Sequence, residues 1–222
     1  MTGSADGERG GGGGGGGGPG GFVGGGFGSG SGGGGSSGRA ADDEQHAAAQ
    51  LSVIKDLRVS GGAVDWWDVS QVDGWTLPYR VDVYGDCSAA KKPIDCSSLA
   101  LSACPDDEDL GGNAGRQSLA LRDPRNASRL VGCYSPCAKL TYSQWNQGFG
   151  NTPESPQARD FCCPTPPISP ARCSAGPVAS ARYVRTVHAL CPSVYGYAYD
   201  DGVGLAQCPA GTRYKVTFYC PK

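Results

Sequence analysis

The feature that most constrains the fold of this 222-residue chain is its set of eleven cysteines, all of which lie between residues 87 and 220. Such a density in a short segment indicates either disulfide bonds or metal coordination. Zinc is the weaker interpretation, because the cysteines form no Cys-x-x-Cys knuckle and the chain has only two histidines, His46 and His188. We therefore expect disulfide bonds, no metal and no cofactor, and the odd number of cysteines leaves one thiol over.

The first part of the chain differs sharply in composition from the rest. Most of the 38 glycines fall within residues 1–38, a tract of glycine and serine with few apolar residues. Such a tract cannot bury enough apolar surface to offset the entropy of ordering it, so residues 1–46 are predicted to form a disordered tail. A phosphate-binding loop is the alternative, but no Gly-Lys-Ser or Gly-Lys-Thr follows the glycines. The folded domain is expected over residues 47–222.

Charge and hydropathy argue against several classes of partner. The formal net charge is −2, and the acids of the tail account for it, so the folded part is nearly neutral. A neutral surface gives no electrostatic case for binding nucleic acid. No apolar run is long enough to span a bilayer, so we expect no membrane insertion. The residues after Met1 lack the basic segment and apolar run of a signal peptide.

Residues 64–83 are the run richest in both structure-forming and chemically useful side chains. Alternating apolar residues predict one strand over 64–69 and a second over 79–83. Between them, Val72-Asp73-Gly74 with Pro78 predicts a turn that Asp68 and Asp73 bracket. An apolar run precedes this region at residues 51–59 and predicts a further strand, with a short helix as the competing interpretation.

The rest of the chain combines predicted helices and strands with two predicted loops. Apolar residues at helical spacing predict short helices over 135–145 and 180–190. Alternating residues predict a strand over 195–199 that runs into a turn at 200–202, and a last strand over 214–220.

The two predicted loops differ in composition. Residues 106–129 contain acids and a Gly-Gly pair and show no periodicity, and residues 164–177 are rich in proline. The first loop holds Asn126-Ala127-Ser128, a glycosylation sequon that matters only if the chain enters the secretory pathway.

The run from Asp68 to Pro78 resembles the signature of thaumatin-like proteins, which is close to Asp-Val-Ser, two residues, then Asp-Gly-aromatic-x-x-Pro. The order of the cysteines is similar to the last eleven of a full member, including the adjacent pair Cys162-Cys163. The resemblance covers residues from about 47 to 222. It implies a mainly β fold: a partial thaumatin-like β-sandwich lacking its N-terminal strands, with a disulfide-rich subdomain of loops and short helices at about 96–191.

The resemblance also implies a disulfide pattern and a free thiol. The family partner of Cys220 lies in a first strand that has no counterpart in residues 1–86, so Cys220 is expected to react as a thiol or to link two chains into a dimer. Each bridge is expected to contribute about 2–4 kcal/mol. By position, the implied bridges are Cys87–Cys208, Cys96–Cys191, Cys104–Cys133, Cys137–Cys162 and Cys163–Cys173.

The resemblance places Asp68, Asp73 and Asp200 at the positions of three acids in the acidic cleft of many members. That cleft is associated with binding, and sometimes slowly hydrolysing, β-1,3-glucans, and Trp75 and Tyr199 are expected to offer flat faces to sugar rings. Hydrolysis needs two carboxyl groups roughly 5–9.5 Å apart, one of them protonated. The family's cleft arginine and glutamate have no match here, which favours binding over catalysis. From the residues alone, each aspartate equally fits a local backbone cap, and the tryptophans fit a core.

Three functions therefore compete. The first is a thaumatin-like defence or wall-associated protein that binds β-1,3-glucan or another polysaccharide, with at most weak endo-β-1,3-glucanase activity. The second is a non-catalytic protein-binding or inhibitory disulfide-rich module, and the third is a truncated gene product without family activity. The disulfides and the resemblance imply secretion.

Overall fold

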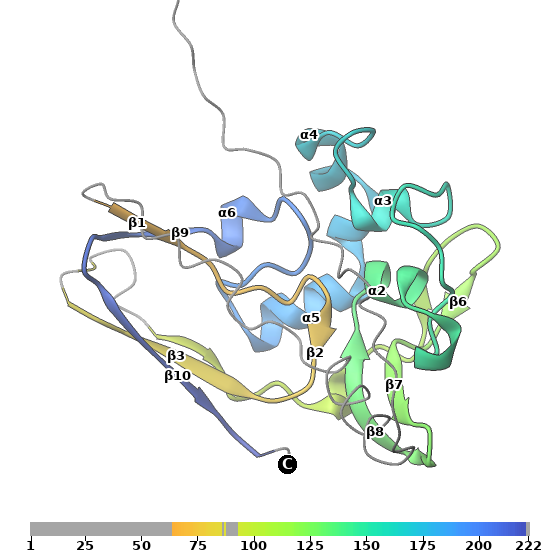
Figure 1. Cartoon of the computed structure of the whole chain (residues 1–222), viewed down its shortest axis with the longest axis horizontal. Helices are drawn as coiled ribbons and strands as arrows, with labels where there is room; N and C mark the ends of the chain where they lie inside the picture. The colour runs from red at the N-terminus through yellow and green to blue at the C-terminus, as the bar shows by residue number, and fades with distance from the viewer. Residues whose placement is uncertain (1–63, 86, 88–92, 221–222) are drawn as a thin grey trace, which may run out of the picture. The chain divides into compact units, whose positions relative to one another are not determined.

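The computed structural model describes residues 64–85, 87 and 93–220. The predicted tail over 1–46 and the predicted strand over 51–59 lie outside the described residues. In the described part of the chain, short strands come first, a run of short helices follows, and two strands end the fold (Figure 1). Five disulfide bonds link these elements. None of its helices has the length and apolar character needed to cross a membrane.

The strands pair into four small antiparallel sheets, with the orders β1-β9, β10-β3-β4, β2-β8-β7 and β5-β6. Each sheet has two or three strands, and the described residues show no closed β-sandwich. The described residues thus show mixed strands and short helices with five disulfides, as expected of the disulfide-rich subdomain, while the mainly β partial sandwich stays a prediction. The strands are β1 (Val64–Trp67), β2 (Gly74–Trp75), β3 (Tyr79–Tyr84), β4 (Ile94–Cys96), β5 (Glu108–Asp109), β6 (Arg116–Gln117), β7 (Ala120–Asp123), β8 (Asn126–Tyr134), β9 (Ala206–Pro209) and β10 (Arg213–Phe218).

The sheet of β3 and β10 follows the alternation of the sequence. On β3, Tyr79 and Val81 are buried, while Arg80 and Asp82 lie on the other face and form an ion pair at 2.8 Å. Val81 lies opposite Val216 of β10, so a buried position of β3 faces an apolar position of its neighbour. The strands predicted over 79–83 and 214–220 are therefore confirmed.

The helices are short, and α2, the first of the two predicted from helical spacing, begins where the sequence offers a start signal. In α2 the hydroxyl of Ser135 accepts a hydrogen bond from the Ala138 amide at 3.0 Å, and Pro136 occupies the first turn. The helices and 3-10 turns are η1 (Leu101–Ala103), α2 (Pro136–Thr141), η2 (Gln144–Asn146), α3 (Arg159–Cys162), α4 (Pro170–Ser174), η3 (Pro177–Ser180), α5 (Arg182–Leu190) and α6 (Asp201–Gly204).

The turn between β1 and β3 depends on a glycine. Gly74 has a φ of +129°, which L side chains rarely adopt, and a Cβ added there would lie 2.0 Å from the carbonyl oxygen of Cys133. Only glycine lets β2 approach β8 this closely. The same pairing sets Trp75 opposite Cys133 and fixes the position of the preceding Asp73.

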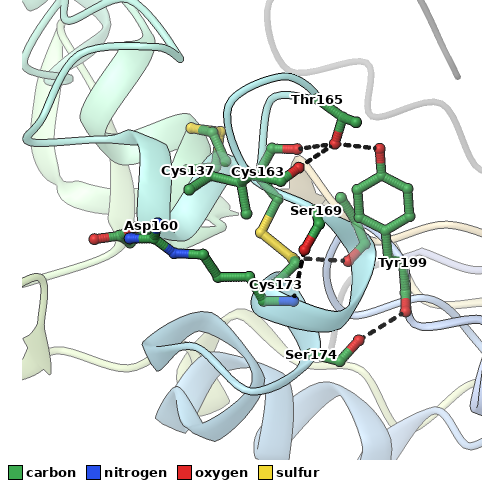
Figure 2. The surroundings of a disulfide bond; sticks show 12 residues. Cys137, Asp160, Cys163, Thr165, Ser169, Cys173, Ser174 and Tyr199 are labelled. Atoms are coloured by element: carbon green, nitrogen blue, oxygen red, sulfur yellow. Dashed lines mark hydrogen bonds and ion pairs between the residues drawn. A yellow bond between two sulfur atoms is a disulfide. The ribbon is translucent and has the colours of Figure 1, made fainter.

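The five disulfides join Cys87–Cys208, Cys96–Cys191, Cys104–Cys133, Cys137–Cys162 and Cys163–Cys173, the same pairs that the family resemblance implies. Two of them anchor the C-terminal end of α3, because Cys162 is the last residue of that helix and Cys163 follows it. Figure 2 shows the Cys163–Cys173 bridge. All eleven cysteines are described, and Cys220 is the one without a disulfide partner and is exposed. Its reactivity and its role in a dimer remain predictions.

Four predictions of local structure are wrong. Residues 106–129, expected to be loop, form β5, β6, β7 and the start of β8. The strand predicted over 195–199 is absent from this described segment, because Tyr195 makes a single parallel bridge to Ser70 and the chain then turns. The residues after it, expected as a turn, form the short helix α6, and the proline-rich loop contains α4.

Candidate functional site

The segment that follows β1 meets the segment that follows α5, and this contact assembles the candidate site. The amide of Tyr195 donates to the Val69 carbonyl at 2.9 Å, and the amide of Gln71 donates to the Tyr195 carbonyl at 2.8 Å. These two bonds join residues far apart in the sequence. They bring the half-buried Asp68 next to the loop that carries Asp200.

Tyr195 lies within this contact, and three carboxylates act on it. Its hydroxyl donates to Oδ1 of Asp201 at 2.6 Å. Burial, that hydrogen bond and the negative charges of Asp201, Asp68 and Asp200 all raise the pKa of Tyr195 above its ordinary value. We name Asp68, Asp200, Asp201 and Tyr195 the aspartate group.

Asp200 is the most enclosed member, with only 5% of its surface exposed. Its Oδ2 accepts the Gly196 amide at 2.9 Å and lies 2.7 Å from Nε2 of His188, which projects from α5. Gly196 allows this arrangement, because a Cβ there would lie 3.1 Å from Cγ1 of Val184 and 3.3 Å from Nε2 of His188. The carboxylate of Asp200 is therefore held as a fixed acceptor.

Asp73 lies in a different setting. Its carbonyl oxygen accepts the Ser135 amide at 3.1 Å, so its backbone ties the turn to the start of α2. Burial and then the charge of Asp73 raise the pKa of Tyr142 to about 12, and the same two causes raise the pKa of the fully buried Tyr183. Asp73 thus faces Tyr142 and Tyr183, whereas Asp68 and Asp200 act on Tyr195.

The two aromatic side chains expected to bind sugar differ in exposure. Trp75 is 1% exposed and stacks on Tyr183, with ring centroids 5.3 Å apart, so it belongs to the core and offers no face to a ligand. Tyr199 is half-buried, and its hydroxyl donates to Oγ1 of Thr165 at 2.8 Å (Figure 2). On β1, the exposed aromatic face belongs to Trp66, which is 49% exposed.

Sequence reasoning missed three residues of this site: His188, Tyr195 and Asp201. A signal for His188 existed, because it follows Val184 by four residues on a predicted amphipathic helix and therefore shares its face. No comparable signal marked Tyr195, since its contact with Ser70 joins segments that only the fold brings together.

Two cavities of the structure lie away from these aspartates in the residues that line them. A cavity of about 540 Å³ is lined by residues such as Glu108, Arg116 and Arg182, and one of about 250 Å³ is lined by residues such as Ile168 and Arg172. Neither includes a member of the aspartate group. Among the described residues no cluster of histidine, cysteine and carboxylate side chains could hold a metal ion.

Comparison with known proteins gives matches to one family model and to several curated plant proteins. Residues 31–221 match the model of the Thaumatin family. The chain is 32% identical to a glucan endo-1,3-beta-glucosidase from Prunus avium over 73% of this chain and 51% of that protein. It is 31% identical to thaumatin-like protein 2 from Prunus persica over 73% of this chain and 52% of that protein. The chain therefore spans about half the length of the curated relatives it matches.

Proposed function

Because the chain belongs to the thaumatin family, we propose that it binds a β-1,3-glucan or a related wall polysaccharide through the aspartate group. The observation that carries the proposal is the geometry around Tyr195: its hydroxyl donates to Asp201 at 2.6 Å, its amide donates to the carbonyl of Val69, which follows Asp68, at 2.9 Å, and the amide of the next residue, Gly196, donates to Asp200 at 2.9 Å. Carboxylates held in fixed positions accept hydrogen bonds from sugar hydroxyls, and the partly exposed Tyr199 and Trp66 offer aromatic faces. The glucanase named among the relatives supports glucan as the ligand class.

Binding fits the geometry better than hydrolysis. A glycosidase needs one carboxyl group that donates a proton and a second that acts as base or nucleophile. Oδ2 of Asp200 already faces the Gly196 amide and the His188 ring, which suits a fixed acceptor rather than a proton donor. Any glucanase activity of this chain is therefore expected to be weak.

The wider setting of the protein is part of the same proposal. Five disulfides in a thaumatin family member are consistent with an extracellular location, and we propose secretion and a defence or wall-associated role. We also propose that one domain covers residues 47–222 and that its disulfide-rich part covers about 96–191.

The test is sedimentation of the full chain with insoluble β-1,3-glucan. Asp68→Asn removes one charge from the aspartate group and is expected to weaken binding about tenfold, the effect of losing one hydrogen bond to a charged acceptor. The matched control is Asp106→Asn, an exposed aspartate outside the group. Equal binding by the two variants would remove the aspartate group from the proposal. Release of reducing sugar from laminarin by the unmodified chain measures hydrolysis separately.

A further inference from the structure

The cavity of about 540 Å³ is lined by residues that do not belong to the aspartate group. Its volume falls in the range of roughly 300–1,000 Å³ that is typical of small-ligand sites. Its walls come from the β5–β6 hairpin, the segment leading into α3, η3 and the first turn of α5. The Cys137–Cys162 and Cys163–Cys173 bridges pin the α3 side, so this wall is held in place before any ligand arrives.

Glu108 contributes a carboxylate to this cavity, but its acceptors are already used. It is 3% exposed, and its two oxygens accept the amides of Arg182 at 3.0 Å and Tyr183 at 2.7 Å. These are the first amides of α5, so the glutamate neutralises the positive end of that helix. The helix N-terminus is therefore not available to a ligand, and Glu108 offers it no free oxygen.

Arginine side chains supply the groups that remain available. Arg116 and Arg182 share one carboxylate, since Oδ2 of Asp107 lies 2.8 Å from Nη1 of the first and 3.6 Å from Nη1 of the second. Arg185 donates to the Ser180 carbonyl, and among the described residues it forms no ion pair. Three guanidiniums therefore line the cavity, and two of them share an ion pair with Asp107, which is not part of the lining.

The two other acids that line the cavity are already engaged. Oδ1 of Asp109 accepts the Gly111 amide at 2.9 Å, and Asp160 pairs with Arg172 at 3.6 Å. The formal charges of the lining sum to zero, but its carboxylates have internal partners while the guanidiniums have donors to spare. A guanidinium presents five donors in a planar fork that suits a carboxylate.

We propose that this cavity binds a short acidic oligosaccharide, whose carboxylates are recognised by Arg116, Arg182 and Arg185. Beyond the charged groups, the lining holds amides and a hydroxyl, such as Asn113, Gln157 and Ser180, which suit a ligand covered in hydroxyl groups.

The adjoining cavity supports a ligand of more than one sugar unit. It has a volume of about 250 Å³ and shares Asp160 and Pro177 with the larger cavity, so the two adjoin, and we refer to them together as the groove. Arg172 lines this second part, and its guanidinium, which pairs with Asp160 at 3.6 Å, keeps further N–H donors. Guanidinium donors therefore occur along the groove rather than at one point, as a chain with a carboxylate on successive units requires.

The experiment is isothermal titration of the full 222-residue chain with trigalacturonate, its fully methyl-esterified form and inorganic sulfate. The esterified trimer keeps the sugar rings and removes the charges. We expect saturable binding of trigalacturonate that weakens at least about tenfold on esterification, and that falls with added NaCl because the arginines are partly exposed. Equal binding of the esterified trimer, tight competition by sulfate, or no saturable binding of trigalacturonate would each overturn the proposal.

A double variant, Arg182→Gln and Arg185→Gln, locates the binding in the groove. Both side chains are exposed, so the variant is expected to fold, which its thermal unfolding curve verifies. It should lose at least about tenfold in affinity for trigalacturonate. Arg129→Gln, an exposed arginine paired with Asp123 on another surface, is the matched control and should bind normally. Equal loss in both would show a non-specific charge effect and overturn the proposal, whereas Asp68→Asn should leave this binding unchanged whatever it does to glucan.

Discussion

The disulfide-rich region, residues 96–191, and the strand region formed by β1, β3, β9 and β10 are held together by different means. Four of the five bridges have both ends in the disulfide-rich region. The strand region is closed by the Cys87–Cys208 bridge and is otherwise stabilised by aromatic contacts. The ring centroids of Trp67 and Tyr214 are 5.0 Å apart, and those of Tyr79 and Phe218 are 6.5 Å apart.

The two regions also differ in how many large apolar side chains they leave exposed. In the strand region Trp66, Tyr84 and Phe218 are large apolar side chains that remain exposed, and Phe218 is 54% exposed although its ring contacts Tyr79. In the disulfide-rich region Phe149 is the described counterpart. Covalent closure thus allows a region of short helices to bury most of its apolar side chains, whereas small sheets with little covalent support depend on a few aromatic contacts.

The first expected effect comes from the bridge of the strand region. Cys87–Cys208 closes 121 residues and Cys163–Cys173 closes 10, but Cys96–Cys191 lies within the longer loop and shortens its effective length to about 26 residues. Loop entropy therefore predicts a loss of about 3.5 kcal/mol in unfolding free energy when the first pair is changed to alanine, and about 3 kcal/mol for the second. Urea unfolding of both double variants measures the difference, and a Cys220→Ser background prevents thiol exchange.

Hydrogen exchange shows whether the regions are separable in these variants. Without Cys87–Cys208, the amides of β1 and β9 should exchange faster while those of α2 and α5 stay protected, because Cys208 lies in β9. Uniform loss of protection across both regions would contradict the comparison, and so would a larger stability loss from the shorter bridge.

The second effect concerns the aromatic contacts of β1. Trp67 is 4% exposed, packs on Tyr214 and places its indole Nε1 3.1 Å from the sulfur of Cys208. Trp67→Ala should therefore cost about 3–5 kcal/mol of unfolding free energy. The adjacent Trp66 is 49% exposed, and Trp66→Ala should cost less than about 1 kcal/mol. Thermal and urea unfolding of the two variants would refute this account if their losses were similar.

The sequence predicted well those elements whose signals are local. The strands β3 and β10 and the helices α2 and α5 follow from alternation, helical spacing and an N-terminal proline or serine. Family resemblance implied the five bridges, which residue spacing alone left open.

The strands over 106–129 were missed because no alternation of apolar and polar residues marks them in the sequence. On β8, Asn126 to Arg129 are all exposed, and the register with β7 shifts at Arg122, so no alternation marks the hairpin. The alternating tyrosines from Tyr195 to Tyr199 led to the opposite error, because they predict a strand where the chain turns. This segment instead packs against other parts of the chain: the carbonyl of Ala198 lies 3.3 Å from the sulfur of Cys173, and Gly204 lies against the ring of Tyr195.

The candidate site was predictable only in part for the same reason. Asp68 and Asp200 could be named from the resemblance, and the structure sets both beside Tyr195. Trp75 was expected to bind a ligand, but a tryptophan next to a buried turn packs into the core when a partner such as Tyr183 is in reach. The arginine-lined groove had no signal, because its residues come from four separate segments.

The smallest of these effects concerns Glu108, which joins the β5–β6 hairpin to α5 by hydrogen bonds rather than by a disulfide. Glu108→Gln keeps the shape of the side chain but replaces one acceptor oxygen with an NH₂ group, which would face an amide donor of Arg182 or Tyr183. A buried donor without an acceptor, together with the lost charge at the start of the helix, should cost about 1–3 kcal/mol. The matched control, the exposed Glu154→Gln, should change stability by less than about 0.5 kcal/mol. Urea unfolding gives both values, and hydrogen exchange at the Arg182 and Tyr183 amides shows where the loss arises. If the two variants were equally stable, the disulfides alone would hold this region and the hydrogen bonds of Glu108 would contribute nothing measurable to it.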